Sequence, residues 1–471
     1  MGKVYLVGAG CGAKELYTLK AIECLKKADC VVYDSLVDED ILNLCKLTCQ
    51  MIFVGKRANH HTMPQDDINQ LLVDLSKQYQ TVVRLKGGDV YVFGRGGEEG
   101  EVLYQNHIDF EVVPGVSSCT AGLAYAGIPI THRGLSGGFQ VYTANLRQGE
   151  ERHFDFTTML DDYVTYVFLM GMSKLKMIVD GFLQAGKNPM TPVAIVSNAS
   201  LRNQQCLTGT LENIVALFKE HPLPTPGIIV VGDVVKMRES LNFYERKPFF
   251  SKKCLVTTVG DDDYLSHALS QLGANVKVVK CGEIEYLEKD FQLEKGYLIF
   301  TSQHGVIGFM KNYMRLYHDV RSLYHMKIVC IGHKTNEKLL EYGLNADMIP
   351  SRADSDDLNK ELEDYCGDGR IYVVQGENKP SIIHYDEIIC VYRNKELEID
   401  ETNDHYDYGF FTCASSVERF SLHNHSSIDT FVSIGKHTSH AIRKYYKECQ
   451  IIETSKASKQ EMIEVVLRGE E

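Results

Sequence analysis

The 471-residue sequence predicts an α/β protein with mostly parallel sheets, arranged as two successive domains of two lobes each. Two observations lead to this prediction. Short apolar runs that end in glycine or polar turns alternate with amphipathic segments, which is typical of strands connected by helices. A charged and aromatic stretch without a clean period then interrupts the series, after which a new strand, turn and helix begin.

The first half opens with a strand and a glycine turn over residues 3–12. Helices are expected over 15–28 and 66–79, because leucine and isoleucine recur there at helical spacing. The apolar runs that predict further strands are 81–88, 108–115, 165–171, 191–198 and 227–235.

The charged and aromatic stretch at 237–253 is the predicted linker. The first domain then spans 1–236, with lobes at about 1–115 and 116–236, and the second domain spans 254–471. Each half is long enough to bury its own core.

The second half contains a weak internal repeat. FTSQHGVIGF (300–309) is similar to FTCASSVERF (411–420), and IGHKT (331–335) is similar to IGKHT (434–438). The two pairs occur in the same order, which favours a duplication and predicts two similar α/β lobes around a cleft.

Composition excludes several classes of protein. A net charge of −13 argues against a bulk nucleic-acid binder or a binder of anionic membranes. No apolar run approaches the ~18 residues of a membrane span, and the N-terminus lacks the pattern of a signal peptide. The 14 cysteines are scattered without a C-x-x-C pair, so we expect no metal site and a reducing, cytoplasmic location.

The glycine turn Val7–Gly12 follows a strand and precedes a helix, and Asp34 closes the next strand. A glycine turn and an acid about twenty residues later is also the dinucleotide pattern. The spacing here is G-x-G-x-G, which disfavours a nicotinamide cofactor. Alternatively, this segment is only a tight turn between a strand and a helix and binds no ligand.

The stretch VGAGCGAKELYTLKA resembles the opening signature of the tetrapyrrole (corrin/porphyrin) methyltransferases. Cys11 stands where that family has proline, and Ala13-Lys14 where it has Asp-Pro. LKGGDVYVFGRGGEE and AGIPITHRG resemble the uroporphyrinogen-III methyltransferase branch. The resemblance covers about residues 1–236 and implies a two-lobed fold that binds S-adenosyl-L-methionine.

The resemblance also implies the residues of the cofactor site. Glycines allow backbone to approach a ligand closely, Asp89 can accept hydrogen bonds, and Met170 offers an apolar wall. The implied cofactor-binding residues are Gly10, Cys11, Gly87, Gly88, Asp89, Val92, Ser117, Ser118, Met170 and Ala199.

Asp34 and Lys56 match the positions that the family assigns to proton acceptor and proton donor. Asp34 alternatively only caps a strand end, and Lys56 only binds a substrate carboxylate. Because uroporphyrinogen carries eight carboxylates, this acidic protein needs a local basic pocket. The implied anchors are Lys56, Arg57, His132 and Arg133. Further basic clusters in this half are Arg84 with Lys86, and Arg95.

The second half resembles uroporphyrinogen-III synthase over about 254–456, carried by the two repeat pairs and the segments around them. VTTVG lacks the family's arginine, and His304 replaces its usual asparagine. Hydroxyls and backbone amides that follow strands suit the carboxylates of a linear tetrapyrrole, although they also cap helices. The implied substrate-binding residues are Thr301, Ser302, Gly305, Gly332, Thr335, Thr412, Ser415, Ser416, Gly435 and Thr438.

Together the resemblances imply an enzyme that cyclises hydroxymethylbilane to uroporphyrinogen III and methylates this product to precorrin-2, for sirohaem or cobalamin. They also imply a homodimer without nucleic-acid or membrane partners. Three alternatives stay open: an NAD-linked oxidoreductase, a non-catalytic C-terminal ligand-binding module, and a methyltransferase acting on a later corrin intermediate.

Overall fold

The computed structural model describes residues 2–37, 39–55, 63–144, 154–261, 263–351, 355–377, 382–400 and 402–470. The chain forms two compact units. The first comprises Met1–Ser251 with Leu272–Ala274, and the second comprises Lys252–Gln271 with Asn275–Glu471. Most of the stretch predicted as a linker therefore packs with the first unit, and the boundary at residue 236 stays a prediction.

The first sheet of unit 1 is entirely parallel, in the order β3-β2-β4-β1-β5. Its strands end at one common edge, which collects the loops that follow them. The strands are β1 (Lys3–Gly8), β2 (Cys30–Tyr33), β3 (Gln50–Phe53), β4 (Thr81–Lys86) and β5 (Phe110–Val113).

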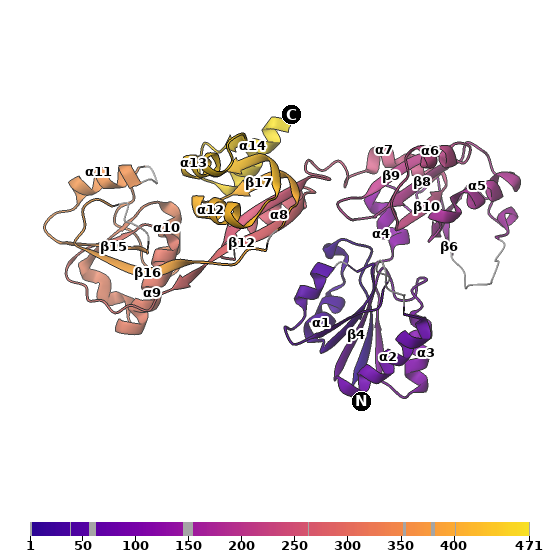
Figure 1. Cartoon of the computed structure of the whole chain (residues 1–471), viewed down its shortest axis with the longest axis horizontal. Coiled ribbons are helices and arrows are strands. Elements are labelled where there is room, and N and C mark those ends of the chain that lie inside the picture. The colour runs from indigo at the N-terminus through magenta and orange to yellow at the C-terminus, as the bar shows by residue number, and fades with distance from the viewer. Residues whose placement is uncertain are drawn as a thin grey trace. The chain divides into compact units, whose positions relative to one another are not determined.

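Helices cover both faces of this sheet (Figure 1). α1 (Leu19–Lys27) contributes Leu25 to a core with Val83, whereas α2 (Gln65–Gln78) contributes Leu72 to a core with Val82. α3 (Gly96–Gln105) lies on the same side as α2. Successive residues of β4 thus face opposite layers, as the period of a strand requires.

The second sheet has the order β6-β7-β10-β8-β9. β6 and β7 are parallel, but the other pairs are antiparallel, which departs from the mostly parallel prediction. The sequence did not predict strand β9, which accounts for one of the antiparallel pairs. The loop 198–204 between β8 and β9 is too short for a parallel crossover, so β9 returns antiparallel to β8. The strands are β6 (Gly138–Thr143), β7 (Val164–Leu169), β8 (Pro192–Ser197), β9 (Gln205–Thr210) and β10 (Gly227–Val231).

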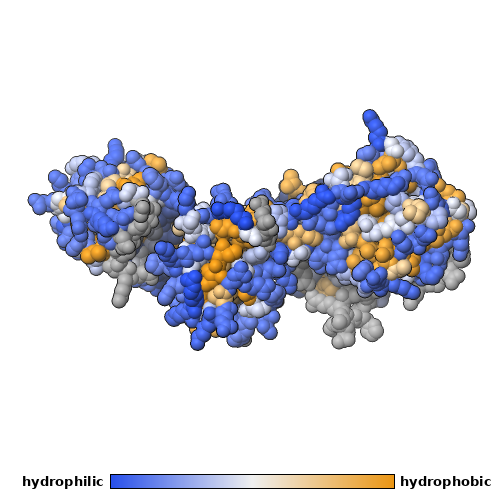
Figure 2. All heavy atoms as spheres, turned by 90° about the horizontal axis from the view of Figure 1, so that it is seen from above, coloured by the Kyte–Doolittle hydropathy of each residue, from blue (hydrophilic) through white to orange (hydrophobic). Residues whose placement is uncertain are grey.

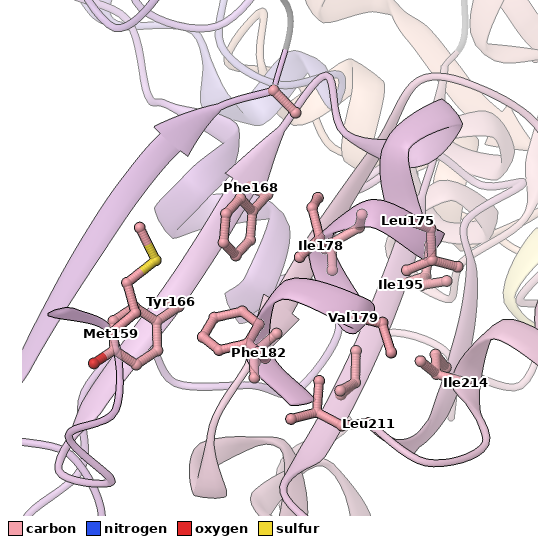
Figure 3. Packing of buried hydrophobic residues seen from close by; sticks show 14 of the residues in the cluster. Met159, Tyr166, Phe168, Leu175, Ile178, Val179, Phe182, Ile195, Leu211 and Ile214 are labelled. Carbon is pink, nitrogen blue, oxygen red and sulfur yellow. The ribbon is translucent and has the colours of Figure 1, made fainter. Parts of the chain in front are cut away.

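An aromatic core supports the second sheet (Figure 3). Phe168 of β7 and Phe182 of α5 are fully buried, with ring centroids 6.0 Å apart. The α-helices of this lobe in the described residues are α4 (Ser118–Tyr125), α5 (Leu175–Gln184), α6 (Ile214–Glu220) and α7 (Arg238–Leu241).

Unit 2 contains one sheet in the order β14-β13-β15-β16-β12-β11-β17-β18-β19. All pairs are parallel except β12 with β16. Figure 1 shows these two long strands running between two groups of helices. The strands are β11 (Lys253–Val259), β12 (Asn275–Tyr286), β13 (Gly296–Phe300), β14 (Met326–Cys330), β15 (Arg370–Gly376), β16 (Glu387–Glu396), β17 (His405–Phe411), β18 (Ser427–Ser433) and β19 (Gln450–Glu453).

The repeated segments occupy equivalent places in the two halves of this sheet. β13 leads into α9 and β14 into α10, as β17 leads into α12 and β18 into α13. Even the residues before the first helices match, since Ser302 and Cys413 have nearly the same backbone angles. The helices of unit 2 are α8 (Tyr264–Gln271), α9 (Gln303–Tyr317), α10 (His333–Leu340), α11 (Ser355–Tyr365), α12 (Ala414–His423), α13 (Lys436–Tyr445) and α14 (Lys459–Glu470).

The face seen in Figure 2 is mostly hydrophilic, as the charged composition leads one to expect. Within the described ranges, no helix combines the length and the apolar character that crossing a bilayer requires.

Candidate functional site

Two glycine turns are bonded to each other at the carboxyl-terminal edge of the first sheet. The amide of Gly10 donates to the carbonyl of Gly88 at 3.1 Å, and the amide of Gly88 donates back at 2.6 Å. Both residues have positive φ, +71° and +72°, which favours glycine. A side chain at Gly88 would meet nothing within 4 Å, so this backbone borders open space.

A third turn, at Gly115, joins these two. A Cβ at Gly115 would overlap the carbonyl of Gly88, and a Cβ at Gly8 would lie 2.5 Å from the amide nitrogen of Gly115. The three backbones therefore approach as closely as only glycine permits. Gly8 and Gly115 are not among the site residues predicted from the sequence, although Gly8 ends β1 and Gly115 follows the end of β5 by two residues.

Asp89 organises these turns. Its Oδ1 accepts hydrogen bonds from the amides of Tyr91 at 2.8 Å and Val92 at 3.1 Å, and its Oδ2 accepts from the amide of Gly115 at 3.0 Å. Both carboxylate oxygens of Asp89 thus accept hydrogen bonds from backbone amides. The half-exposed Val92 and the turn at Gly87 flank Asp89, so its carboxylate fixes the backbone of the segment that the sequence predicts as a cofactor site.

Ser117 and Ser118 stand at the start of α4, which packs on the second sheet. The Ser117 hydroxyl is 3.2 Å from the Cys119 sulfur. Further along α4, a Cβ at Gly122 would lie 2.9 Å from the Cβ of Ala199. The middle of α4 thereby packs against the segment that follows β8.

Cys11 connects the same two regions directly. Its thiol is 3.5 Å from the hydroxyl of Ser200, and that hydroxyl donates to the Cys11 carbonyl at 3.2 Å. The Ser200 hydroxyl also accepts from the amide of Ala13 at 3.1 Å. Burial raises the pKa of the Cys11 thiol, although its bond to Ser200 acts in the opposite direction.

Met170 follows β7 at the same edge of the second sheet as Ala199. Ile228 of β10 pairs with Leu169 on one side and Val196 on the other, which aligns the ends of β7 and β8. Met170 has a φ of +55° and is 47% exposed. Its side chain is thus available as an apolar wall.

The predicted acid–base and anchoring residues are only partly described. Lys56 and Arg57 lie outside the described residues. Asp34 follows β2 at the first sheet's edge, and its Oδ1 accepts from the amide of Leu36 at 3.1 Å. Arg84 and Lys86 are buried against Glu99, so in this structure they do not offer free charges to substrate carboxylates.

His132 and Arg133 form a tight turn after α4. The amide of His132 donates to the Ser136 carbonyl at 3.1 Å, and Arg133 is exposed. Nδ1 of His132 is buried without a partner in the described part of the chain. Arg95 is half-exposed at the start of α3, where Nε and Nη2 bind both carboxylate oxygens of Glu98 at 2.9 and 2.6 Å.

In unit 2, the predicted polar residues lie at the starts of four helices but differ in access. Thr335, Ser416 and Thr438 are buried, and the Ser416 hydroxyl donates to the Cys413 carbonyl, which favours their alternative role in helix starts. Gly305 is buried as well, whereas the partly exposed residues are Thr301, Ser302, Thr412 and Ser415. Gly332 and Gly435 directly precede α10 and α13.

His304 forms an aromatic cluster that the sequence signalled only as a departure from the family's asparagine. Nδ1 of His304 is 3.0 Å from the Tyr286 hydroxyl, and the imidazole centroid is 5.7 Å from the Tyr392 ring centroid. The Tyr392 hydroxyl is in turn 3.0 Å from the hydroxyl of Ser302, which caps α9. Burial lowers the pKa of His304, and nearby Lys338 lowers it further.

Two family models match successive parts of the chain. Residues 3–215 match the tetrapyrrole (corrin/porphyrin) methylases, and residues 263–464 match uroporphyrinogen-III synthase HemD. The porphyrin biosynthesis protein HemD of Ruminiclostridium josui is 34% identical over 487 aligned residues, which cover 96% of each chain.

Other relatives match the first half alone. The siroheme synthase of Psychrobacter cryohalolentis is 46% identical over 247 residues, which are 52% of this chain and 47% of that protein, so the chain spans about half its length. The crystal structure of uroporphyrin III C-methyl transferase from Thermus thermophilus is 39% identical, with a TM-score of 0.43, and covers 50% of this chain and 99% of that chain.

The relative aligned over nearly all of both chains and the two adjoining family matches agree with the resemblances found in the sequence. The chain therefore belongs to the tetrapyrrole methylases through its first half and to the uroporphyrinogen-III synthases through its second, and it is an enzyme of these two families.

Proposed function

We propose that the chain catalyses two consecutive reactions of tetrapyrrole biosynthesis. The second unit closes hydroxymethylbilane to uroporphyrinogen III, and the first unit methylates that product to precorrin-2. The observation that carries this proposal is the union of both families in one chain, because the product of a synthase of this kind is the substrate of the methyltransferase.

The turns of unit 1 fit S-adenosyl-L-methionine as the methyl donor. The open backbone at Gly88 allows a ligand to approach closely, and the first turn of α4 favours its carboxylate. Met170 and Val92 offer apolar surface to the rest of the molecule. When bound, this cofactor supplies an electrophilic methyl group.

The protein's own contribution is alignment and proton management. Asp34 takes the proton that the macrocycle loses once a ring carbon has gained the methyl group, and Lys56 returns a proton as the macrocycle tautomerises. Arg57, His132 and Arg133 bind the carboxylates of the substrate, because guanidinium groups pair well with carboxylates. The half-exposed Arg95 is a further candidate for this role.

In unit 2, the groups at the ends of β13 and β17 bind the carboxylates of hydroxymethylbilane and fold it for closure. Ser302 and Thr301 follow β13, and Thr412 and Ser415 follow β17. Ligands of parallel sheets bind at these carboxyl ends. His304 stands at the same edge, where it donates a hydrogen bond to the substrate.

We further propose that the protein is a cytoplasmic homodimer with domains at 1–236 and 254–471, and that its product enters sirohaem or cobalamin biosynthesis. These points follow from the family resemblance, and the many scattered cysteines fit a reducing location.

A paired assay of the full chain tests the function. Hydroxymethylbilane is supplied with and without S-adenosyl-L-methionine, and the products are oxidised and separated. We expect an excess of the type III isomer over type I without the cofactor and a dimethylated product with it. Type I alone would refute the synthase activity, and uroporphyrinogen III that never gains methyl groups would refute the methyltransferase activity.

A further inference from the structure

Four charged side chains form a network at the carboxyl-terminal edge of the first sheet. Asp34 follows β2, Arg84 and Lys86 lie on β4, and Glu99 lies on α3. The exposed fractions of Arg84, Lys86 and Glu99 are 4%, 3% and 0%, whereas the Asp34 side chain keeps 24%. The network therefore reaches solvent at the end occupied by the proposed proton acceptor.

Glu99 forms the inner end of this network. Its Oε1 accepts hydrogen bonds from Nε of Arg84 at 3.1 Å, Nζ of Lys86 at 2.7 Å and Nε2 of Gln65 at 3.2 Å. Its Oε2 is buried and has no hydrogen-bond partner among the residues that the structure describes. One carboxylate oxygen thus holds both buried cations.

Arg84 connects Glu99 to Asp34. Its Nη1 donates to the carbonyls of Val32 at 3.3 Å and Leu85 at 3.0 Å, and its Nη2 donates to Oδ2 of Asp34 at 3.4 Å. Because the amide of Leu36 binds the other oxygen of Asp34, the plane of this carboxylate is held from both sides. A guanidinium held at three nitrogens cannot rotate, so it imposes one orientation on its partner.

Stability alone does not explain such a network. Buried ion pairs contribute little net stability, and apolar side chains of similar volume serve a fold at least as well. The two cations also oppose each other: the pKa of Lys86 is lowered, mainly by burial and then by Arg84, although Glu99 acts in the opposite direction. An oriented carboxylate, in contrast, requires a fixed donor.

We propose that Arg84 is a positioning residue that orients the Asp34 carboxylate for proton removal during methyl transfer, and that Glu99 and Lys86 hold Arg84 in place. This inference rests on the proposed function, because the role of Asp34 belongs to it. Orientation affects the rate strongly, since reacting groups must stay within ~0.5 Å of the productive geometry.

A double-mutant cycle tests the inference. The variants are Arg84→Lys and Asp34→Asn, separately and together, in the full chain. The single-turnover rate of methyl transfer to uroporphyrinogen III and the affinity for S-adenosyl-L-methionine are measured for each. Lysine keeps the charge but lacks the fork, so we expect a rate loss of about 10- to 100-fold with cofactor affinity nearly unchanged. When Asp34→Asn is already present, adding Arg84→Lys should lower the methyl-transfer rate by less than about twofold, because the two residues act as one unit.

Lys187 provides a matched control. It is 4% exposed and donates to the carbonyls of Leu160 and Asp161 at 3.1 and 3.0 Å, in the second lobe. Lys187→Gln should lower the melting temperature but leave the rate per folded molecule unchanged. If Arg84→Lys does not fold, Glu99→Gln, which preserves shape, takes its place in the same cycle.

The outcomes separate the inference from the proposed function. Two outcomes with an active wild-type enzyme overturn the inference alone. In the first, the rate losses of Arg84→Lys and Asp34→Asn multiply in the double variant. In the second, Arg84→Lys methylates at the wild-type rate. A wild-type chain that binds S-adenosyl-L-methionine but methylates no uroporphyrinogen III overturns the proposed function and the inference with it.

Discussion

The thiol of Cys11 lies 3.5 Å from the hydroxyl of Ser200, although 189 positions separate the two residues. Ser200 is buried, and its hydroxyl also binds the carbonyl of Cys11 and the amide of Ala13. The glycine turn of the first lobe is therefore held by the second lobe. This contact holds a turn in which Cys11 occupies the place where the family resemblance implies a more rigid proline.

Ser200→Ala removes these bonds and should weaken the binding of S-adenosyl-L-methionine. A buried hydrogen bond contributes about 1 kcal/mol, and a loss of ~1.4 kcal/mol changes a dissociation constant tenfold. We therefore expect a dissociation constant about 5- to 10-fold higher by isothermal titration calorimetry. Ser240→Ala is the control, because Ser240 is exposed in α7 and its hydroxyl donates to the Met237 carbonyl. Equal affinities of wild type and Ser200→Ala would contradict a role of this contact in cofactor binding.

Gly115→Ala should disrupt the assembly of the three turns. Its added methyl group would overlap the carbonyl of Gly88 and the backbone of Gly8, and neither can move independently. We expect a loss of about 1–3 kcal/mol of unfolding free energy in denaturant titrations and at least a 100-fold loss of cofactor affinity. Gly97→Ala in α3 is the control, since its methyl group would meet nothing within 4 Å. Wild-type binding by Gly115→Ala would show that the turns are not tightly coupled.

His304→Ala should impair the synthase reaction. Burial lowers the pKa of His304, so its imidazole is neutral near pH 7 and, with Nδ1 bound to the Tyr286 hydroxyl, presents Nε2. We expect type III formation to slow about 10-fold, with a larger share of the type I isomer from spontaneous closure. The exposed His384 of the same unit supplies the control His384→Ala. An unchanged isomer ratio in His304→Ala would exclude His304 from the reaction.

The stability of unit 2 should fall at alkaline pH because of buried thiols. Burial raises the pKa of Cys330 from 9.0 to about 12, so between these values the native state binds more protons than the unfolded state. Stability is therefore intact below pH 9 and decreases as the pH rises towards 12, by roughly 1.4 kcal/mol per pH unit for one such thiol.

Denaturant unfolding at pH 8 and pH 10.5 measures this effect. Cys330→Ala should reduce the difference between the two pH values, whereas Cys366→Ala, at a half-buried thiol, should reduce it less. Equal pH dependence of wild type and Cys330→Ala would rule out titration of Cys330 as a cause.

The motifs predicted much of the unit 1 site. Gly10, Gly88 and Asp89 were chosen from sequence, and the structure brings them together, because glycine turns after parallel strands meet at one sheet edge. Their binding roles stay predictions. The internal repeat likewise indicated the equivalent places of Ser302 and Cys413 before α9 and α12, since similar local sequences form similar helix starts.

By itself, the sequence determined the two families, the α/β class and the glycine turns at the strand ends, because these depend on local spacing and on motifs. Only the tertiary structure decided that Arg84 and Lys86 face inward. They lie two residues apart on β4, the central strand of the first sheet, so their side chains share one face of the sheet. Both point to the layer where α3 supplies Glu99. A sequence shows that two cations share one face of a strand, but which partner covers that face depends on the packing of distant segments.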